Sequence, residues 1–421
     1  MTYEMEYLMH LFSCGAQGLE PKPPQKQIDW EKTASLAVDQ SITYTTALPI
    51  KKYELGCPES IRSRLTASLR GASIKNAMKT DGILDLVNDF EKAGIHVLIV
   101  KGIDVARFYK NPECRVSSDA DLFVKKEDEQ RALDFLESYG FTMEKRPKSS
   151  NHTECYHPTL GMVELHIQLL QDMFTNSLMK NWRVDEDAFS KCKAQEFSGK
   201  KYYALETTDS LLFLTYHMIK HFLYGGMSLR MMMDNAIFAK CNLDLIDKER
   251  YKALLEESKH LHFMQAVFGI MVKYCCFSPN DFPIDVIIDD STGESILNDL
   301  EKGGWQGMNY GVAGLDAWYY YRYKHAMNEA DENELSEIKG EVQLDYIHKL
   351  FPTMTWMKRM YPKLQAKPWL YPFYLIQRLF VKGWKIITGK GRMSKRQIDK
   401  ETELSESARE RIELFKALDM I

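Results

Sequence analysis

The pattern of apolar and polar residues predicts a small mixed α/β sheet between about residues 76 and 204. A helical stripe of apolar side chains ends at Gly94, and the β-branched run at 95–100 predicts a buried strand directly after it. Shorter runs of helical or alternating periodicity follow. They predict helices at 103–109 and 127–139 and strands at 119–124, 141–145, 153–157 and 162–169.

Helical periodicity dominates on both sides of this core. Proline and glycine interrupt residues 1–75, which predicts an N-terminal lobe of short helices. Long apolar stripes predict an all-helical domain over 205–345, whose first helix has Thr208 or Asp209 as its N-cap. The last segment, 346–421, predicts a helical tail with a basic end. We therefore expect an α+β fold, in which a small mixed β-sheet lies between an N-terminal helical lobe and a C-terminal all-helical domain.

Charge and composition give no support for a nucleic-acid-binding, membrane-spanning, secreted or zinc-binding protein. The net charge of -4 gives no electrostatic reason to expect nucleic-acid binding, and the sequence has no clear nucleic-acid signature. No stretch reaches the ~18 uncharged apolar residues of a transmembrane segment, and no signal peptide is recognisable. The eight cysteines are scattered without a CxxC pair, which predicts reduced thiols and no paired zinc-ligand spacing. Together these features predict a cytoplasmic protein.

The tail admits two interpretations. Aromatic and basic residues mix from Trp369 to Lys400, a composition that could place the tail on an anionic membrane surface or on a partner. The alternative is a packed helix followed by a solvated basic end. We favour this second interpretation and treat peripheral membrane contact as the weaker one.

Strand periodicity places three carboxylates so that they can meet at one point. Residues i and i+2 of a strand face the same way, so Asp119 and Asp121 project from one face while their apolar neighbours are buried. Glu164 lies on the polar face of the strand predicted at 162–169 and can project toward the same point. Carboxylate oxygens suit Mg²⁺ or Mn²⁺, and two such ions can clamp a triphosphate during phosphoryl transfer. We predict that these three residues bind metal and carry catalysis.

A donor-rich turn for phosphate groups is predicted before the first aspartate. Lys101 and Gly102 end one strand and lead into a helix, so the turn offers close backbone approach, a helix dipole and a cation. Arg115 and Ser118 are further phosphate-binding candidates. These four residues form the predicted nucleotide-binding set.

Four sequence segments carry a resemblance to a known family. They read VLIVKG, FYKNPECR, SDADLFV and GMVELHIQL in chain order. They resemble the poorly characterised bacterial nucleotidyltransferase family of the DNA polymerase beta-like superfamily, which also contains the minimal and aminoglycoside nucleotidyltransferases. The resemblance covers residues from about 30 to about 300 and is strongest over 95–168. It implies that residues 76–204 form a nucleotidyltransferase core.

The resemblance also implies roles for individual residues. Asp119 and Asp121 take the place of the metal-binding DxD pair of the superfamily, and Glu164 takes the place of its third acidic residue. That third residue commonly lies nearest the attacking oxygen, so Glu164 is the candidate to help deprotonate the acceptor. Lys101 and Gly102 stand where other branches carry a Gly-Ser pair.

Further residues are expected to line the substrate cleft. His166 shares the strand face of Glu164, where it can touch bound substrate or hold the carboxylate in place. The segments LTYHMIKHFLYGG and SLRMMMDNA resemble the helical region that follows the core in this family. The cleft candidates there are His217, Lys220, His221, Arg230 and Asp234. Because the HExxH pattern of zinc proteases is absent, we favour a cleft or core position for the two histidines over a zinc site.

The sequence therefore predicts a metal-dependent nucleotidyltransferase that moves a nucleoside monophosphate from a nucleoside triphosphate such as ATP to a hydroxyl acceptor, with release of pyrophosphate. The acceptor can be a small molecule, a saccharide or a protein. Two alternatives stay open. One is a nucleotide-binding or regulatory module of the same fold that has lost turnover, and the other, which the single strand before Asp119 makes the weaker, is a DxD glycosyltransferase.

Overall fold

The computed structural model describes residues 1–143, 151–170, 179, 181–224, 226–288, 290–303, 317, 320–321, 357, 367–377 and 406–421. The chain forms two compact units. One comprises Met1–Gly314 with Glu413–Ile421, and the other comprises Leu315–Ile412. All the predicted site residues belong to the first unit.

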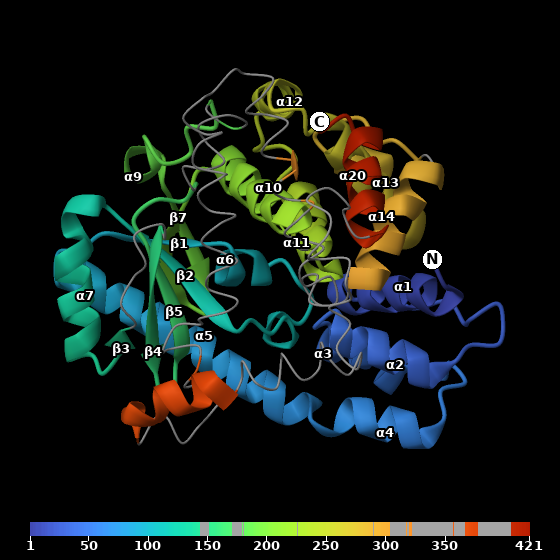
Figure 1. Ribbon diagram of the computed structural model, residues 1–421, viewed down its shortest axis with the longest axis horizontal. Coiled ribbons are helices and arrows are strands. Elements are labelled where there is room, and N and C mark those ends of the chain that lie inside the picture. The colour runs from blue at the N-terminus through green and yellow to red at the C-terminus, as the bar shows by residue number, and fades with distance from the viewer. Residues whose placement is uncertain are drawn as a thin grey trace. The chain divides into compact units, whose positions relative to one another are not determined.

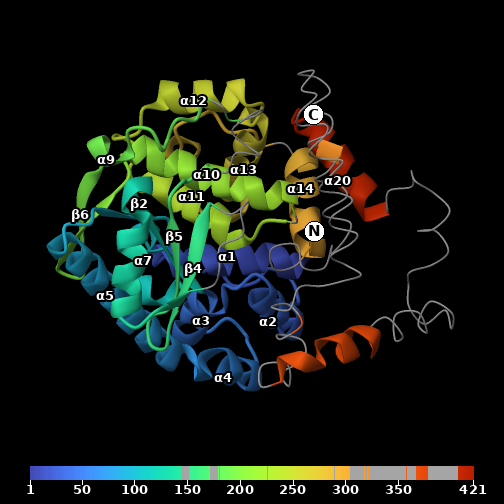
Figure 2. The ribbon, with the colours of Figure 1, turned by 60° about the vertical axis from the view of Figure 1, so that its left-hand side comes forward.

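Five helices precede the sheet. They are α1 (Tyr3–Gln17), α2 (Trp30–Asp39), α3 (Thr43–Lys52), α4 (Glu59–Ala67) and α5 (Leu69–Lys92). The Asp29 carboxylate caps α2 by accepting a hydrogen bond from the Lys32 N–H at 3.1 Å. Tyr7, Trp30 and Leu65 belong to an apolar core that joins α1 to α4, and these helices lie side by side in Figures 1 and 2. The predicted N-terminal helical lobe is confirmed.

A mixed seven-stranded sheet is present in the described part of the first unit. Its strands are β1 (Val97–Val100), β2 (Asp119–Val124), β3 (Thr142–Met143), β4 (His152–His157), β5 (Gly161–His166), β6 (Lys193–Phe197) and β7 (Lys200–Ala204). Their order is β3-β4-β5-β2-β1-β7-β6. β2 pairs parallel with β5 and β1 pairs parallel with β7, whereas the other pairs are antiparallel. The predicted α+β class is confirmed.

The hairpin of β6 and β7 is the part of the sheet that the sequence pattern does not predict. Charged residues such as Lys193, Glu196 and Lys201 occupy its exposed positions, so apolar alternation is weak. The available signal is the turn, because Ser198 and Gly199 both have positive φ, 53° and 74°, as two-residue hairpin turns require. The predicted strands otherwise differ from the observed ones by a few residues at their ends.

The other helices described in the first unit follow β1 along the chain. They are α6 (Gly102–Ala106), α7 (Glu129–Ser138), α9 (Ala188–Lys191), α10 (Thr207–Tyr224), α11 (Leu229–Cys241), α12 (Lys248–Glu257), α13 (Leu261–Tyr274) and α14 (Asp290–Gly303), and α20 (Glu406–Ala417) ends in this unit.

The N-cap predicted for α10 is wrong. The helix begins at Thr207, and the carboxylate of Glu206 accepts hydrogen bonds from the N–H groups of Thr208 and Asp209 at 3.0 and 3.3 Å. Asp209 instead pairs with Arg250 at 2.5 Å. Glu206 therefore caps the helix in place of Thr208 or Asp209, which were predicted as the N-cap.

The two faces of the sheet have different neighbours. On one face, α5 and α7 pack against apolar side chains that include Ile99, Leu122 and Leu165. Successive strand residues face opposite sides, so Asp121 and Glu164 face away from this core. Figure 1 shows α10 and α11 on the side of the sheet opposite to α7. The polar face of the predicted strands therefore opens toward the helical region.

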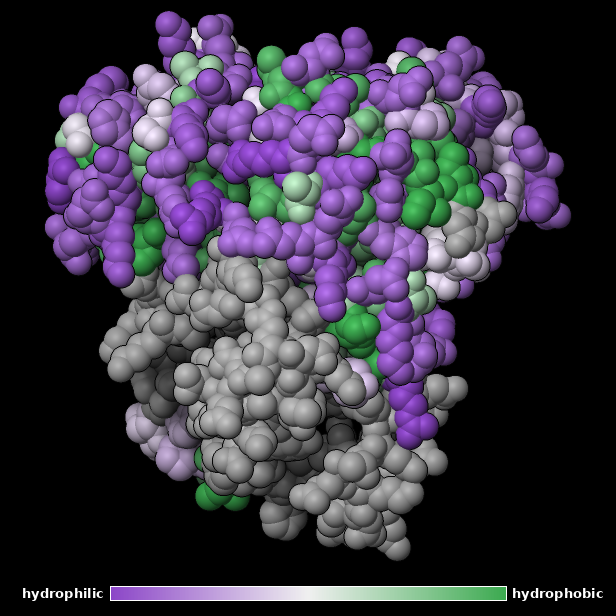
Figure 3. Space-filling model, turned by 90° about the horizontal axis from the view of Figure 1, so that it is seen from above, coloured by the Kyte–Doolittle hydropathy of each residue, from purple (hydrophilic) through white to green (hydrophobic). Residues whose placement is uncertain are grey.

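Much of the tail predicted at 346–421 lies outside the described residues. The basic run at 378–400, with its possible membrane contact, is among the residues that the structure does not describe. In the described ranges, no helix has both the length and the apolar character needed to cross a bilayer. The described residues on the face in Figure 3 are mostly hydrophilic, with hydrophobic groups scattered between them. The division into 1–75, 76–204, 205–345 and 346–421 remains a prediction.

Candidate active site

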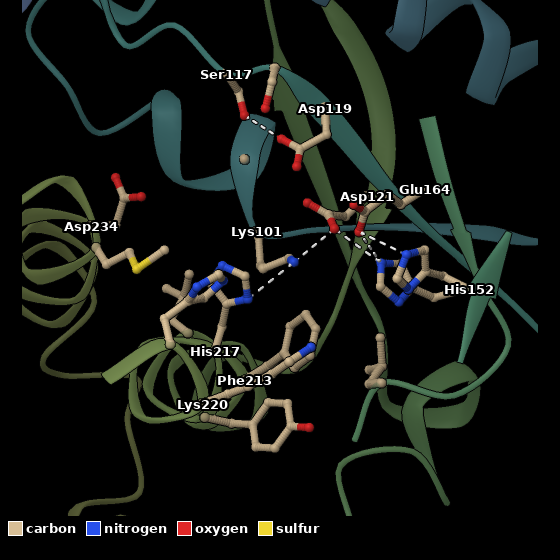
Figure 4. A pocket seen from close by; sticks show the side chains of 18 of the residues that line it. Lys101, Ser117, Asp119, Asp121, His152, Glu164, Phe213, His217, Lys220 and Asp234 are labelled. Atoms are coloured by element: carbon tan, nitrogen blue, oxygen red, sulfur yellow. Dashed lines mark hydrogen bonds and ion pairs between the residues drawn. The ribbon is translucent and has the colours of Figure 1, made fainter. Parts of the chain in front are cut away.

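Asp119, Asp121 and Glu164 line one pocket of about 360 Å³. The parallel register of β2 and β5 puts Asp121 opposite Glu164 and Asp119 opposite Met162. Because paired strands lie ~4.8 Å apart, the two opposed carboxylates project side by side. Figure 4 shows Asp121 and Glu164 together, with Asp119 further along β2. The structure thus brings together the three residues predicted as metal ligands.

A buried histidine lies between two of these carboxylates. His166 Nε2 is 3.0 Å from Asp121 Oδ1 and 3.3 Å from Glu164 Oε2. Burial lowers the pKa of His166, but the hydrogen bonds to both carboxylates outweigh burial and raise it. Burial likewise opposes ionisation of Glu164, yet His166 and the charge of Lys101 lower its pKa to about 2. Glu164 is therefore a carboxylate at neutral pH.

A second histidine, which sequence reasoning missed, completes this side of the pocket. His152 on β4 is opposite His166 in the strand register, and its Nε2 lies 3.9 Å from Glu164 Oε2. The ligand atoms of His152, Glu164 and His166 all lie within 4.8 Å of one another. The available signal was weak, since His152 stands just before the strand predicted at 153–157. The turn Thr159-Leu160-Gly161 between the two predicted strands indicates a hairpin, and the antiparallel pairing of β4 with β5 confirms it. The predicted strand, however, begins one residue after His152.

Lys101 contacts the carboxylates directly. Its Nζ lies 2.7 Å from Asp121 Oδ1 and 3.5 Å from His217 Nδ1. Burial lowers the pKa of Lys101, but the charges of Asp121 and Glu164 outweigh burial and raise it. The backbone of Lys101 has φ 57° and ψ -138°, a conformation that favours glycine. The ion pair therefore holds a strained residue in place at the end of β1.

Gly102 presents bare backbone to the same pocket. It is the first residue of α6, and a Cβ added to it would meet no atom within 4 Å. Protein packing therefore does not explain the glycine. Open space beside a backbone N–H is what close approach of a phosphate requires, although α6 has only five residues and a correspondingly small dipole.

In the part of the chain that the structure describes, each of the three carboxylates has one oxygen that accepts no hydrogen bond. Asp119 Oδ1 accepts a hydrogen bond from Ser117 Oγ at 2.7 Å, and Asp121 Oδ1 and Glu164 Oε2 take the contacts described above. No described residue donates a hydrogen bond to Asp119 Oδ2, Asp121 Oδ2 or Glu164 Oε1. Carboxylate oxygens suit a divalent cation such as Mg²⁺ or Mn²⁺. Asp121 and Glu164 lie side by side, whereas the ligand atoms of all three carboxylates do not come within 4.8 Å of one another in the described arrangement.

The opposite wall of the pocket carries cations. Lys220 of α10 and Arg230 of α11 both line it, and Figure 4 places Lys220 and His217 across from the carboxylates. Burial and the charge of Lys101 lower the pKa of Lys220 to about 8. Arg230 donates to the Val116 carbonyl at 2.8 Å. Neither cation has a carboxylate within 4 Å among the residues that the structure describes.

The two histidines of α10 are neutral members of this wall. Their rings form an edge-on contact with centroids 4.5 Å apart. Burial and the charge of Lys101 hold the pKa of His217 well below its ordinary value, and burial and Lys220 lower that of His221 to about 3. They add surface and hydrogen-bonding atoms to the wall without adding charge.

Arg115 and Asp234, two further predicted residues, pair with each other. Arg115 Nε and Nη2 donate to the Asp234 carboxylate at 2.9 and 2.6 Å, and the Tyr109 hydroxyl donates to it at 2.7 Å. All three are buried, and both predicted residues line the pocket. Asp234 thus holds Arg115 in place, and a phosphate-binding role for Arg115 remains a prediction.

Helix α5 supports the loop that leads to Asp119. Asn76 Nδ2 donates to the carbonyls of Glu113 and Arg115 at 3.1 and 3.3 Å. Lys79 Nζ donates to the carbonyls of Ser117 and Ser118 at 3.2 and 2.9 Å. Sequence reasoning missed both, because helix periodicity shows which face is buried but not which loop it touches. The predicted site residue Ser118 lines the pocket and offers its carbonyl to Lys79.

A larger pocket of about 800 Å³ adjoins the first one. The two share Ser117, Ser118 and Arg230 in their linings. The rest of the larger pocket comes from the N-terminal helices and the segments between them. In that part of the lining, the residues that carry a hydroxyl group are Ser35, Ser41, Thr43, Tyr44 and Ser68.

A mixed sheet with three carboxylates on one pocket wall and cations on the other is an arrangement that suits a divalent cation and a phosphorylated ligand. The chain belongs to the family described as uncharacterised nucleotidyltransferases, which it matches over residues 26–275. This confirms the resemblance seen in the sequence. No curated protein and no solved structure matches the chain.

Proposed function

We propose that the protein is a metal-dependent nucleotidyltransferase that transfers a nucleoside monophosphate from a nucleoside triphosphate to a hydroxyl acceptor and releases pyrophosphate. One observation carries this proposal. Three carboxylates, Asp119, Asp121 and Glu164, share one pocket with Lys220 and Arg230, and Figure 4 places Lys220 across from them. The first set suits a divalent cation and the second suits phosphate oxygens.

The carboxylate oxygens of Asp119, Asp121 and Glu164 would hold Mg²⁺ or Mn²⁺. When bound, the cation supplies neutralising charge on the triphosphate and makes the acceptor hydroxyl more acidic. The low pKa of Glu164 keeps its carboxylate ionised, which suits a ligand better than a proton acceptor. A role for Glu164 in removing the acceptor proton remains a prediction, to be tested with Glu164→Gln.

The remaining residues of the pocket orient the nucleotide. Lys220 and Arg230 neutralise and position the phosphates, and Gly102 allows the backbone to approach them. Lys101, already paired with Asp121, can turn toward a phosphate when a cation takes over the charge of that carboxylate. Such positioning and charge neutralisation are the main protein contributions to phosphoryl transfer.

The larger pocket is where we place the acceptor. It meets the first pocket at Ser117, Ser118 and Arg230, next to Asp119. Its lining of serine, threonine and tyrosine hydroxyls offers both hydrogen-bond donors and acceptors. Glu31 and Arg64 also line this pocket, but they pair with each other. The hydroxyls therefore favour a hydroxyl-rich acceptor such as a saccharide.

The decisive experiment measures Mg²⁺-dependent binding of each of the four nucleoside triphosphates, and pyrophosphate release in an acceptor screen. The wild type is compared with Asp119→Asn/Asp121→Asn. The matched control is Asp134→Asn/Asp244→Asn, which makes the same chemical change at two exposed positions outside the pocket. We expect the control to bind like the wild type and the site variant to lose metal-dependent binding. Equal binding by all three proteins would overturn the proposal.

The rival function is a nucleotide-binding module that no longer catalyses transfer. The observation that favours it is the ion pair between Lys101 and Asp121, which already neutralises a predicted metal ligand. Metal-dependent triphosphate binding without pyrophosphate release, with saccharide, small-molecule and protein acceptors alike, would favour this rival. No observation in the structure favours a glycosyltransferase, since only β1 precedes Asp119.

A further inference from the structure

Two cysteines and a histidine lie together outside the carboxylate pocket. His10 and Cys14 are one turn apart on α1, and Cys276 follows the end of α13. Their ligand atoms, one from each residue, all lie within 4.8 Å of one another. Neighbouring contacts fix the two segments to each other, because Gln17 Nε2 donates to the Cys275 carbonyl at 3.1 Å. The sequence hides this cluster, since its members are far apart in the chain.

The hydrogen bonds of His10 determine which of its nitrogens carries hydrogen. The backbone N–H of Lys22 donates to His10 Nε2 at 2.9 Å, so that nitrogen uses its lone pair as an acceptor. The hydrogen of the neutral ring is then on Nδ1, which lies 3.5 Å from Cys276 Sγ. A ring N–H pointing at a sulfur stabilises the thiolate over the thiol.

The two cysteines are therefore unequal. The neighbouring Cys14 thiol and the His10 ring hold the pKa of Cys276 well below its ordinary value. The proximity of Cys276, together with burial, raises the pKa of Cys14, whose Sγ lies 3.8 Å from His10 Nε2. Cys276 is exposed and Cys14 is buried. The pair thus consists of an accessible thiolate beside a protected thiol, which is the arrangement of an attacking and a resolving cysteine.

Space and backbone conformation support access to Cys276. A pocket of about 370 Å³ opens beside it, and His10 is part of the lining. The charged and titratable groups that face this pocket are Tyr3, Glu6, Tyr7, Lys22, Lys273 and Tyr274. Cys276 has φ 58°, a left-handed conformation that side-chain-bearing residues seldom adopt. A small oxidant can reach the sulfur from this pocket.

We propose that Cys276 and Cys14 are a redox-active pair that a peroxide converts to a reversible disulfide between α1 and the segment after α13. The Cys276 thiolate attacks one peroxide oxygen, the O–O bond breaks, and Cys276 becomes a sulfenic acid with release of hydroxide or alkoxide. The Cys14 sulfur then displaces the sulfenic hydroxyl group, which takes up the Cys14 thiol proton and leaves as water. Two electrons pass from the two sulfurs to the peroxide, and a thiol reductant reverses the change.

The same cluster is less suited to zinc. A zinc ion would need a lone pair on a His10 nitrogen, but Nε2 already accepts the Lys22 N–H. Binding through Nδ1 would move the hydrogen to Nε2 and break that hydrogen bond. The cluster also offers three protein ligands, whereas structural zinc sites have four.

The test uses the full-length protein and four forms: wild type, Cys276→Ser, Cys14→Ser and Cys241→Ser. Cys241 is the matched control, because it is also exposed but burial raises its pKa. After mild hydrogen peroxide, mass spectrometry of non-reduced digests should show a peptide linked through Cys14 and Cys276 in wild type and Cys241→Ser. Cys14→Ser should stop at a Cys276 sulfenic acid that dimedone traps, and Cys276→Ser should show neither product.

A second measurement separates reactivity from folding. Iodoacetamide at pH 6 should label Cys276 in the wild type at least tenfold faster than Cys241, because an ordinary thiol is almost fully protonated there. Equal labelling rates, absence of the linked peptide, or stoichiometric zinc that Cys14→Ser abolishes would each overturn the proposal. Neither measurement involves nucleotide, so failure here leaves the proposed transferase function unaffected.

Discussion

The Lys101 ammonium group lies 2.7 Å from Asp121 Oδ1, and Lys101 adopts a backbone conformation with φ 57° to reach it. The ammonium therefore occupies one side of a carboxylate that the proposed function assigns to a cation. Charge balance in this pocket is the quantity that binding of metal and nucleotide changes.

Replacing Lys101 should separate charge from backbone strain. Without bound metal, Lys101→Ala leaves Asp121 with less compensation and should lower the free energy of unfolding by roughly 3 kcal/mol. Lys101→Gly removes the same charge but relieves the positive φ, so it should recover about 1–2 kcal/mol relative to alanine. Urea unfolding of both variants in EDTA measures the difference. Equal stabilities would contradict the assigned strain.

Saturating Mg²⁺ should stabilise both Lys101 variants more than it stabilises the wild type. In the variants the cation replaces the missing charge, whereas in the wild type it competes with the ammonium for Asp121. The measurement is the shift in Tm on adding Mg²⁺. Equal shifts in all three proteins would show that the cation does not share this carboxylate.

Stability in acid should depend on Glu164. Its folded-state pKa of about 2 lies below the ordinary value of 4.5, so the ionised carboxylate stabilises the fold above pH 4.5. This contribution is lost as pH falls from 4.5 toward 2, and it amounts to at most about 3 kcal/mol. Unfolding measured against pH in EDTA should show a shallower acid decline for Glu164→Gln. The exposed control Glu196→Gln should keep the wild-type slope.

The affinity for triphosphate should fall as Lys220 loses its proton. Its pKa of about 8 means that Lys220 is charged below pH 8 and increasingly neutral above it. We expect kcat/KM for the nucleotide to decline above pH 8 in the wild type, and Lys220→Arg to extend the plateau because arginine stays protonated. Lys126→Arg, outside the pocket, is the control. A pH profile that Lys220→Arg leaves unchanged would remove Lys220 from phosphate binding.

Gly102→Ala should weaken nucleotide binding without affecting the fold. The added methyl group meets no protein atom within 4 Å, so stability should change by less than about 1 kcal/mol. In the pocket, however, the methyl group blocks backbone approach and should raise the dissociation constant at least tenfold. Gly71→Ala on α5 also meets nothing and serves as the control. Unchanged affinity in Gly102→Ala would place the phosphates elsewhere.

The carboxylates could be predicted because their geometry is local. Asp119 and Asp121 share a strand face by periodicity alone, and Glu164 follows from the same rule applied to β5. His152 was not assigned to the site, because the hairpin predicted around residues 159–161 does not by itself fix that His152 is paired and opposite His166. Periodicity states which way a side chain faces within its own strand, and it says nothing about the register of the neighbouring strand.

Contacts between distant segments were equally inaccessible from the sequence. Arg115 and Asp234 each have the chemistry of a ligand-binding residue, and only the fold shows that they neutralise each other. In the sequence, Lys79 has no feature that distinguishes it from a solvent-exposed lysine on a helix. Only the structure shows that it donates to carbonyls of the loop before Asp119. The β6–β7 hairpin was missed for a different reason, since its charged exposed residues weaken the strand pattern.

Helix α5 connects the two pockets mechanically. Its Asn76 and Lys79 hold the loop of residues 113–118, whose Ser117 and Ser118 form the boundary between the pockets. Ser68, the residue immediately before α5, also lines the larger pocket. One continuous helix therefore fixes the spacing between the place where an acceptor would rest and the aspartates that would act on it. The protein would then select acceptors by the distance between the group that binds in the larger pocket and the hydroxyl that reacts.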